Sequence, residues 1–289
     1  MQIKPEQEAI LSECKCVRVR NCNQQILSTI VGAKLNSQEQ SNLIHLFRHP
    51  KHIDDEFKRH LASYLVLAPD NTVLMFFSLR CGELFEKVDD KKIETARTAY
   101  KALQTLYRNS QNPVEEERNQ AIEILRHIAE SGLTIDEILN LVDEKKDYFA
   151  DEGKEPNELV SRVSKVFPGV ELKFYGINDA GRKYWKTTGL HHKMGLTLYW
   201  KFIVPKLEEL QDIVGCQYMY LFAADKEADG HLVTYYRTAL HINANHFLSS
   251  NKPQFDYSSV FLYQEISELQ KQRDYFFNTF NDTMIQDSV

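Results

Sequence analysis

Two apolar runs with a polar turn between them stand out in the first third of the chain. They read "YLVL" and "VLMFFSL", are rich in β-branched and aromatic residues, and flank the turn Pro69-Asp70-Asn71. Runs of this kind around a Pro-Asp-Asn turn are typical of a β-hairpin. Upstream, "CKCVRV" at 14–19 predicts a further strand, and residues 37–60 have the pattern of a helical segment. The first part of the chain therefore predicts mixed α and β structure.

A different pattern runs from residue 88 to residue 167, where glycine is scarce and charged residues and helix formers dominate. Apolar side chains recur there with the 3.6-residue period of an amphipathic helix. Pro113, followed by several Glu residues, predicts the start of a second helix. Thr134 and Glu137 have the spacing of a capping box and predict the start of a third. We therefore expect an all-helical segment.

The mixed pattern returns after Pro168-Gly169. Two apolar stretches predict strands, and they alternate with segments of helical period. Pro205 lies inside the longer of these segments and is expected to kink it. The expected elements are a strand at 170–178, a helix at 196–214, a strand at 216–224, a helix at 231–240, and a strand that runs into a terminal helix within 255–280.

Composition places the chain among ordinary globular proteins. Of its 289 residues 43% are hydrophobic and 26% are charged, and the formal net charge of −6 offers no general attraction to nucleic acid or to an anionic membrane. The five cysteines are scattered and odd in number, which favours reduced thiols over a disulfide framework. The N-terminus "MQIKPEQEAI" has no apolar signal-peptide core, and no apolar run approaches the length of a membrane span. A cytoplasmic protein is the expectation.

Three groups of residues have the look of metal sites but lack a complete ligand set. The histidines lack the Glu that follows the first His in a zincin, and they lack a third ligand, so we prefer a surface helix. The cysteines lack the second pair of a zinc site. The acidic stretch lacks the terminal Glu of a calcium loop, and we interpret it as a turn. We therefore expect no metal. The groups are His45, His49 and His52; Cys14, Cys16 and Cys22; and Asp225 to Gly230.

Four pieces of the second half together resemble one known family. They read "VELKFYGIN", "HHKMGLTLYWKFIVPKLEEL", "GCQYMYLFAAD" and "LVTYYRTAL", and the hairpin fits as well. This set is similar to the GNAT superfamily of N-acetyltransferases, in particular to a poorly characterised bacterial branch, over about residues 60–87 and 168–243. The resemblance implies an α+β fold. Its mixed, mostly antiparallel sheet would have a V-shaped splay between central strands and flanking helices. The core would comprise 1–87 and 168–289, with 88–167 as a helical insertion.

The resemblance also implies acetyl-CoA, or another acyl-CoA, as co-substrate, and no metal. The strand Val170–Asn178 would part from Cys216–Ala223, and backbone groups near its end would bind the pantetheine arm. The family pattern for the pyrophosphate loop starts with Arg or Gln and ends on a small residue. In this chain His192 stands at the position of the Arg or Gln, and Thr197 stands at the position of the small residue. The alternative to a phosphate-binding loop is that His191 and His192 are simply a solvated pair. The implied cofactor-binding residues are Tyr175, Gly176, Ile177, His192, Lys193, Met194, Gly195, Leu196 and Thr197.

Two adjacent tyrosines supply the candidate general acid. In the family a Tyr on the helix after the second splayed strand protonates the departing thiolate, and Tyr236 matches that position. Tyr235, about 100° further round the helix, is the second candidate. The alternative is that both are core aromatics with hydroxyls at the surface. Glu171 and Glu83 are the candidates for the base that deprotonates the acceptor, against the alternative that each is a solvated charge at a strand end.

These features lead to two hypotheses of different class. The first is an acyl-CoA-dependent N-acyltransferase in which an acceptor amine attacks the thioester directly. The acidic chain favours a cationic amine over nucleic acid as the acceptor. The second is a catalytically inactive GNAT-like binding protein that uses the inserted helices for a partner. Neither membrane binding nor a covalent enzyme intermediate is expected, and a homodimer is left open.

Overall fold

The computed structural model describes residues 2–282 apart from 32–43, 46, 88–89, 112, 131, 133, 146–162, 225–229, 244–247 and 251–258. The chain divides into two compact units. One combines Met1–Phe85 with Val166–Val289, and the other is Glu86–Lys165. The acidic turn at 225–229 lies outside the described residues.

The larger unit holds the sheet and most of the helices. Its helices are α1 (Pro5–Glu13), η1 (Val19–Asn21), α2 (Gln24–Ser28), α4 (Pro50–Phe57), α8 (Gly181–Thr187), α9 (Met194–Leu198), η3 (Tyr199–Ile203), α10 (Val204–Val214), α11 (His231–Thr238) and α12 (Ile266–Asn278). Its strands are β1 (Lys15–Arg18), β2 (Ala62–Leu67), β3 (Val73–Lys87), β4 (Val163–Ile177), β5 (Tyr218–Ala223), β6 (Leu248–Ser249) and β7 (Val260–Glu265).

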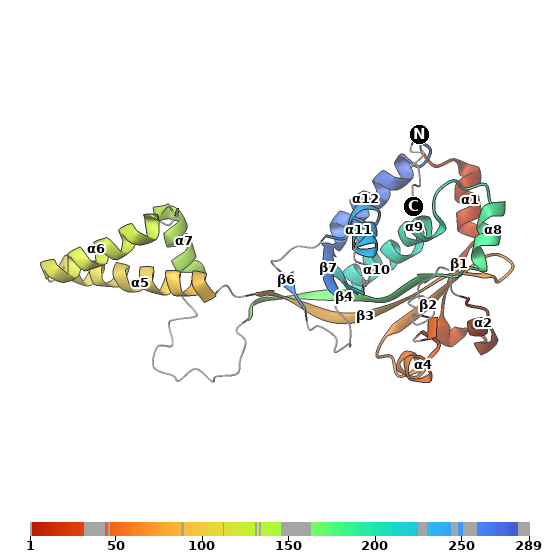
Figure 1. Ribbon diagram of the computed structural model, residues 1–289, viewed down its shortest axis with the longest axis horizontal. Coiled ribbons are helices and arrows are strands. Elements are labelled where there is room, and N and C mark those ends of the chain that lie inside the picture. The colour runs from red at the N-terminus through yellow and green to blue at the C-terminus, as the bar shows by residue number, and fades with distance from the viewer. Residues whose placement is uncertain are drawn as a thin grey trace. The chain divides into compact units, whose positions relative to one another are not determined.

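The strands form one mixed sheet in the order β1-β2-β3-β4-β5-β7, with β6 paired to β3. The pairs β1–β2, β2–β3 and β5–β7 are antiparallel, whereas β4–β5 is parallel. Helices α1 and α8 to α12 lie on one face, and α2 and α4 lie on the other (Figure 1). The expected fold class, an α+β protein with a mostly antiparallel sheet flanked by helices, is confirmed.

The predicted hairpin is confirmed as β2 and β3. Its turn is closed by the backbone bond from the Ala68 N–H to the Thr72 carbonyl, and the Asp70 carboxylate accepts the Thr72 N–H. Asn71 takes the left-handed conformation that Asn tolerates better than most residues. The strands reach further than the sequence predicted: β4 starts at Val163, so Pro168 lies within a strand instead of at its border.

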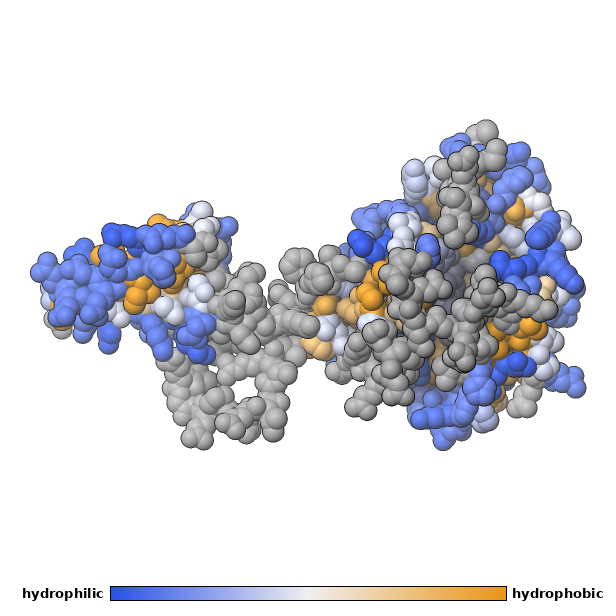
Figure 2. Space-filling view, in the orientation of Figure 1, coloured by the Kyte–Doolittle hydropathy of each residue, from blue (hydrophilic) through white to orange (hydrophobic). Residues whose placement is uncertain are grey.

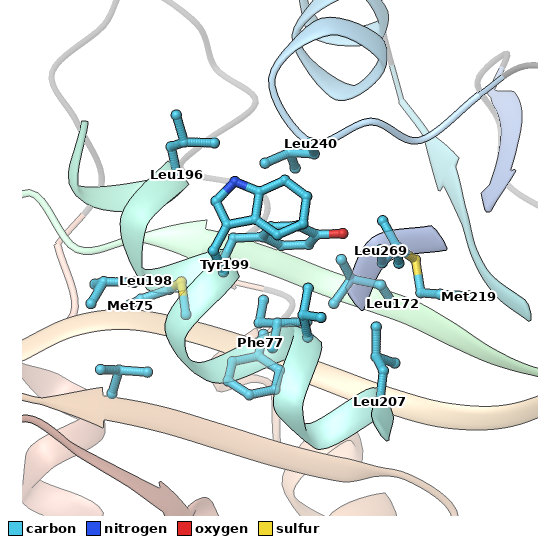
Figure 3. Packing of buried hydrophobic residues seen from close by; sticks show 14 of the residues in the cluster. Met75, Phe77, Leu172, Leu196, Leu198, Tyr199, Leu207, Met219, Leu240 and Leu269 are labelled. Atoms are coloured by element: carbon cyan, nitrogen blue, oxygen red, sulfur yellow. The ribbon is translucent and has the colours of Figure 1, made fainter. Parts of the chain in front are cut away.

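The core on the α8–α12 face of the sheet centres on the segment that follows the predicted phosphate loop (Figure 3). Tyr199 and Trp200 are almost fully buried there. Pro205 sits in the first turn of α10, directly after the π-helical turn η3. A proline cannot donate the backbone bond of a regular helix, and a π-helical turn absorbs such a local mismatch. The irregularity expected at Pro205 is therefore found as a π-helical turn just before it.

The smaller unit is helical, as predicted. Its helices are α5 (Asp90–Gln111), α6 (Glu115–Glu130) and α7 (Ile135–Lys145). The predicted capping box is present, since the Thr134 hydroxyl accepts the Glu137 N–H while the Glu137 carboxylate accepts the Thr134 N–H. Ala99, Ile128 and Ile138 pack together between the helices. The visible face of these helices is mostly hydrophilic, with apolar side chains gathered between them (Figure 2).

A buried polar network joins α4 to the sheet. His52 and Glu56 are one helical turn apart and both buried, so the prediction that the histidines lie on a surface helix is wrong for His52. The Glu56 carboxylate accepts bonds from the Arg18 guanidinium at 2.8 Å and from the Ser63 N–H at 2.6 Å. The Ser63 hydroxyl lies 2.9 Å from His52 Nε2. These bonds satisfy polar groups that the sequence pattern alone assigned to solvent.

Stability should fall with acid because of His52. Burial, helped by the positive charge of Lys173, lowers the pKa of His52 from 6.5 to about 4. The unfolded chain then binds more protons than the folded chain between these values. The imidazole's contribution is complete above pH 6.5 and is lost as the pH falls toward 4, by about 2–3 kcal/mol. Urea unfolding of the wild type and of His52→Gln across pH 4–7 measures it. If His52→Gln lost as much stability as the wild type between pH 7 and pH 4, the effect would belong to other groups.

Two further observations complete the description. None of the helices in the described part of the chain is long and apolar enough to cross a membrane. All five cysteines are free, and burial raises the pKa of the Cys14 thiol to about 11, so that this thiol is unreactive at neutral pH.

Candidate active site

The sheet forks between β4 and β5. Their parallel pairing is confined to Gly169–Glu171 against Tyr218–Tyr220. Beyond Glu171, β4 continues to Ile177 and β5 continues to Ala223 without pairing to one another. The splay between these two strands, expected from the family resemblance, is confirmed. It leaves main-chain groups on the facing edges of both strands that the sheet itself does not satisfy.

A slip in the side-chain alternation of β4 accompanies the fork. Leu172 and Tyr175 both pack into the core on the helix side of the sheet, although residues three apart on a regular strand face opposite ways. Lys173 and Phe174 lie between them. The Lys173 ammonium is 5.7 Å from the Phe174 ring centre, and Phe174 packs into the core on the opposite face. Two successive residues therefore share a face, as at a β-bulge, which bends a strand.

Two tyrosine hydroxyls meet beside the fork. Tyr175 on β4 and Tyr235 on α11 have their hydroxyl oxygens 3.5 Å apart. A β-carbon placed on Gly195, near the start of α9, would lie 3.1 Å from the Tyr175 hydroxyl and 3.8 Å from that of Tyr235. It would also lie 3.1 Å from Ile177. The glycine thus lets α9 approach β4 closely, a role the sequence had assigned to phosphate approach.

Two further tyrosines belong to this group. Tyr199 packs edge-on against Tyr175, with ring centres 6.2 Å apart, and Tyr236 is buried next to Tyr235. Burial raises the pKa of Tyr175, and the neighbouring Tyr235 adds to the shift. Burial likewise raises the pKa of Tyr199. These phenols therefore stay protonated at neutral pH and can donate hydrogen bonds.

The structure ranks the two candidate acids differently from the sequence. The Tyr235 hydroxyl is the one that reaches Tyr175 and the start of α9. Tyr236, the first candidate from sequence, is 9% exposed and packs within the main core. It still lies close enough to Tyr175 to raise the pKa of that phenol. Both tyrosines thus border the fork, but Tyr235 presents its hydroxyl to it.

The start of α9 provides backbone donors near the open end of the fork. Lys193 is the exposed N-cap residue, and α9 runs from Met194 into η3 and α10. The first backbone N–H groups of a helix have no intrahelical partner and attract anions. Met194, Gly195 and Leu196 are buried. The buried hydroxyl of Thr197 donates to the Lys193 carbonyl and so serves the helix end.

His192 is not available as an anion ligand. Its ring is buried, its Nε2–H donates to the Phe280 carbonyl, and it packs on the Phe280 ring with centres 4.4 Å apart. Its carbonyl accepts the Trp185 indole N–H at 2.9 Å. The sequence-based reading of His192 as a replacement for the phosphate-binding Arg or Gln is therefore wrong for its side chain. The alternative of a solvated pair is also wrong for His192 and holds only for His191, which is exposed.

The two candidate bases occupy different places. Glu171 ends the paired stretch of β4, is buried, and accepts a bond from Arg80 Nε at 2.7 Å. It is therefore an ion-paired group at the fork and not a solvated strand end. Glu83 is exposed on β3, seven residues from Phe76, which contacts Gly176. At about 3.3 Å per residue it lies roughly 23 Å along the strand from that point, so the structure does not bring Glu83 to the tyrosines.

Two residues of this region were missed by the sequence reading. Arg80 carried no motif, because an arginine on a strand is ordinarily an exposed charge. Tyr199 was counted only as one position on the apolar face of a helix. Tyr199 follows Gly195 by four residues, which is about one helical turn, so both residues lie on the same face of the helix. This spacing was the available signal that Tyr199 lies over the same part of β4 as Gly195.

No family model matches the chain, and no curated protein sequence matches it significantly. Among solved structures, one described as a bacterial toxin has a TM-score of 0.45 and 11% identity, over 91% of this chain and 96% of that one. A mutant of the toxin AtaT bound to the C-terminus of the antitoxin AtaR and acetyl-CoA has a TM-score of 0.40 and 11% identity, over 90% and 98%. AtaT complexed with acetyl-methionyl-tRNAfMet has a TM-score of 0.39 and 12% identity, over 90% and 98%. At these TM-scores the similarities carry no conclusion about activity.

Proposed function

We propose that this chain is an acyl-CoA-dependent N-acyltransferase, with acetyl-CoA as the simplest donor. The observation that carries the proposal is the fork, where two parallel strands pair at Gly169–Glu171 and then part. A pantetheine arm is long, thin and bears amide groups. It fits such a gap as an added strand would, by bonding to main-chain groups that the sheet leaves unpaired.

The charged end of the donor belongs at the start of α9. Free N–H groups there, the helix dipole and the exposed ammonium of Lys193 favour a pyrophosphate. The arm then runs along Tyr175–Ile177 toward Leu172. It replaces the contact between the Tyr175 and Tyr235 hydroxyls, which at 3.5 Å is at the long limit of a hydrogen bond and costs little to break.

The residues beside the fork suit a direct transfer. The lone pair of the acceptor amine attacks the thioester carbonyl carbon, a C–N bond forms, the C–S bond breaks, and its electron pair passes to sulfur. The Tyr235 hydroxyl gives its proton to that sulfur. The proton lost by the amine passes to Glu171, directly or through water, and from there back to Tyr235 by way of solvent. Arg80 holds the Glu171 carboxylate in place.

Binding of the donor can be tested without knowing the acceptor. Calorimetric titration with acetyl-CoA should give an affinity in the micromolar range, about −8 kcal/mol. Lys193→Glu should weaken binding about 5- to 30-fold, because it turns an attractive charge at the pyrophosphate into a repulsive one. Lys186→Glu, at the exposed end of α8, changes the net charge equally and should have little effect. No binding by the wild type at millimolar acetyl-CoA would contradict the proposal.

Transfer itself needs a panel of acceptors. We expect acetyl-CoA consumption to rise with an amine such as a polyamine, a lysine-containing peptide or an aminoacyl-tRNA. The last belongs in the panel because AtaT was solved with acetyl-methionyl-tRNAfMet. Release of the free thiol of CoA follows the reaction. Tight acetyl-CoA binding without thiol release for any amine would favour the inactive binding protein.

A further inference from the structure

One buried hydroxyl beside the fork has no hydrogen-bond partner. Tyr199 is 0% exposed, and its hydroxyl oxygen makes no hydrogen bond to any part of the chain that the structure describes. The other hydroxyl nearby, that of Tyr175, meets Tyr235. A buried hydroxyl without a partner costs the folded chain about 1–3 kcal/mol of desolvation. Phenylalanine would fill the same volume without this cost, so the hydroxyl needs a reason to be there.

The backbone around Tyr199 is unusual as well. Tyr199 is the first residue of the π-helical turn η3, which joins α9 to α10. Such turns are rare, occur mostly as single turns inside α-helices, and are frequently found at functional sites. In Figure 3 the Tyr199 ring lies in the middle of the core, and its hydroxyl points to the side on which Leu269, Leu172 and Met219 are drawn.

That side is where β4 and β5 part. Leu172 is the first residue of β4 beyond the paired stretch, and Met219 belongs to the paired stretch of β5. The Tyr199 ring packs edge-on against Tyr175, whose hydroxyl lies 3.5 Å from that of Tyr235. Burial raises the pKa of Tyr199, which keeps the phenol protonated and makes it a donor. The hydroxyl thus offers a proton at the inner end of the fork to an acceptor that the described part of the chain does not supply.

We propose that the Tyr199 hydroxyl is a binding group for the acyl donor and gives a hydrogen bond to a carbonyl oxygen of the acyl-pantetheine arm. This inference rests on the proposed function, since it names the part of the same donor that the inner end of the fork recognises. The carbonyl is either that of the thioester or that of a pantetheine amide. Both carbonyls present the same hydrogen-bonding group, an uncharged sp² oxygen that accepts.

The test is Tyr199→Phe in the full chain, with two measurements. Chemical unfolding of the ligand-free protein should show a stability equal to or greater than that of the wild type, because the substitution removes an unsatisfied polar group and keeps the ring. Calorimetric titration should show acetyl-CoA binding weakened about 5- to 30-fold, the loss of one hydrogen bond to a buried donor. Tyr218→Phe, on the opposite face of β5, is the matched control and should leave the affinity unchanged.

Titration with free CoA then separates the two carbonyls. A loss of affinity confined to acetyl-CoA places the bond on the thioester carbonyl, and an equal loss for both ligands places it on an amide. Unchanged affinity for both ligands in Tyr199→Phe overturns this inference and leaves the proposed function standing. Lower stability of the ligand-free variant also overturns it, since the hydroxyl would then have a partner within the fold. A wild type that binds no acetyl-CoA overturns the proposed function and this inference together.

Discussion

Tyr235→Phe should lower the rate of acyl transfer about 100-fold while leaving the affinity for acetyl-CoA within a few-fold. The variant keeps the ring and its packing but cannot give a proton to the departing sulfur. General acid catalysis accelerates a reaction about 10²–10⁴-fold. We expect the lower end of this range because solvent can supply part of the proton transfer. The hydroxyl of Tyr235 is the one that faces Tyr175 on β4, along which the pantetheine arm is placed. Thiol release at saturating donor and acceptor measures the effect.

Tyr236→Phe is the matched control on the neighbouring residue. Its ring is buried in the main core, so the loss of its hydroxyl should change the rate less than about five-fold. A large loss in Tyr236→Phe with a near-normal Tyr235→Phe would restore the ranking predicted from sequence and refute the assignment made from the hydroxyl positions. Near-normal rates in both variants would exclude both tyrosines of α11 as the acid.

Asn178→Ala should destabilise the larger unit by about 3–4 kcal/mol. The fully buried side chain of Asn178 follows the last residue of β4, accepts the Val31 N–H at 2.8 Å and donates to the Val73 carbonyl at 2.7 Å. The substitution removes both bonds and leaves the part-buried Val31 N–H and the buried Val73 carbonyl with fewer partners, at a cost of up to about 1–3 kcal/mol each. Urea unfolding followed by tryptophan fluorescence reports the change, because Trp185 and Trp200 lie in this unit.

Asn243→Ala is the control for that loss. Its amide also makes one side-chain bond, to Gln264, but the residue is exposed. Exposed groups exchange a protein partner for water, so the change should stay within about 0.5 kcal/mol. If Asn178→Ala lost as little stability as Asn243→Ala, water would have to replace the hydrogen bonds of the Asn178 side chain. The end of β4 would then be held less firmly than the structure indicates.

The elements that the sequence predicted well have local causes. The hairpin follows from two apolar runs that flank Pro69-Asp70-Asn71, and the start of α7 follows from Thr134 and Glu137. Each depends on residues within a few positions of each other, which a sequence shows directly. The fork was predicted only through a family resemblance. No residue pattern within 170–178 indicates that this strand stops pairing with β5 after Glu171.

The elements that the sequence missed depend on distant residues. His192 looked like a loop residue until Phe280, 88 residues later, was seen to accept its N–H. His52 looked like a surface histidine, but Ser63 and Ser78 pair across two strands beneath it. Tyr199 looked like a routine core aromatic, and only the packed structure shows that its hydroxyl has no hydrogen-bond partner among the described residues. In each case tertiary contacts gave a polar side chain a role that its neighbours in sequence did not indicate.

The central claim is that a pantetheine arm pairs with β4 where β5 has left it. Residue-resolved amide hydrogen exchange, with and without saturating acetyl-CoA, tests it most directly. We predict slower exchange at alternate amides between Leu172 and Ile177 and at the first amides of α9, with β1 and β2 unchanged as internal controls. Binding that leaves the amides of β4 beyond Glu171 exchanging at their ligand-free rates would contradict it.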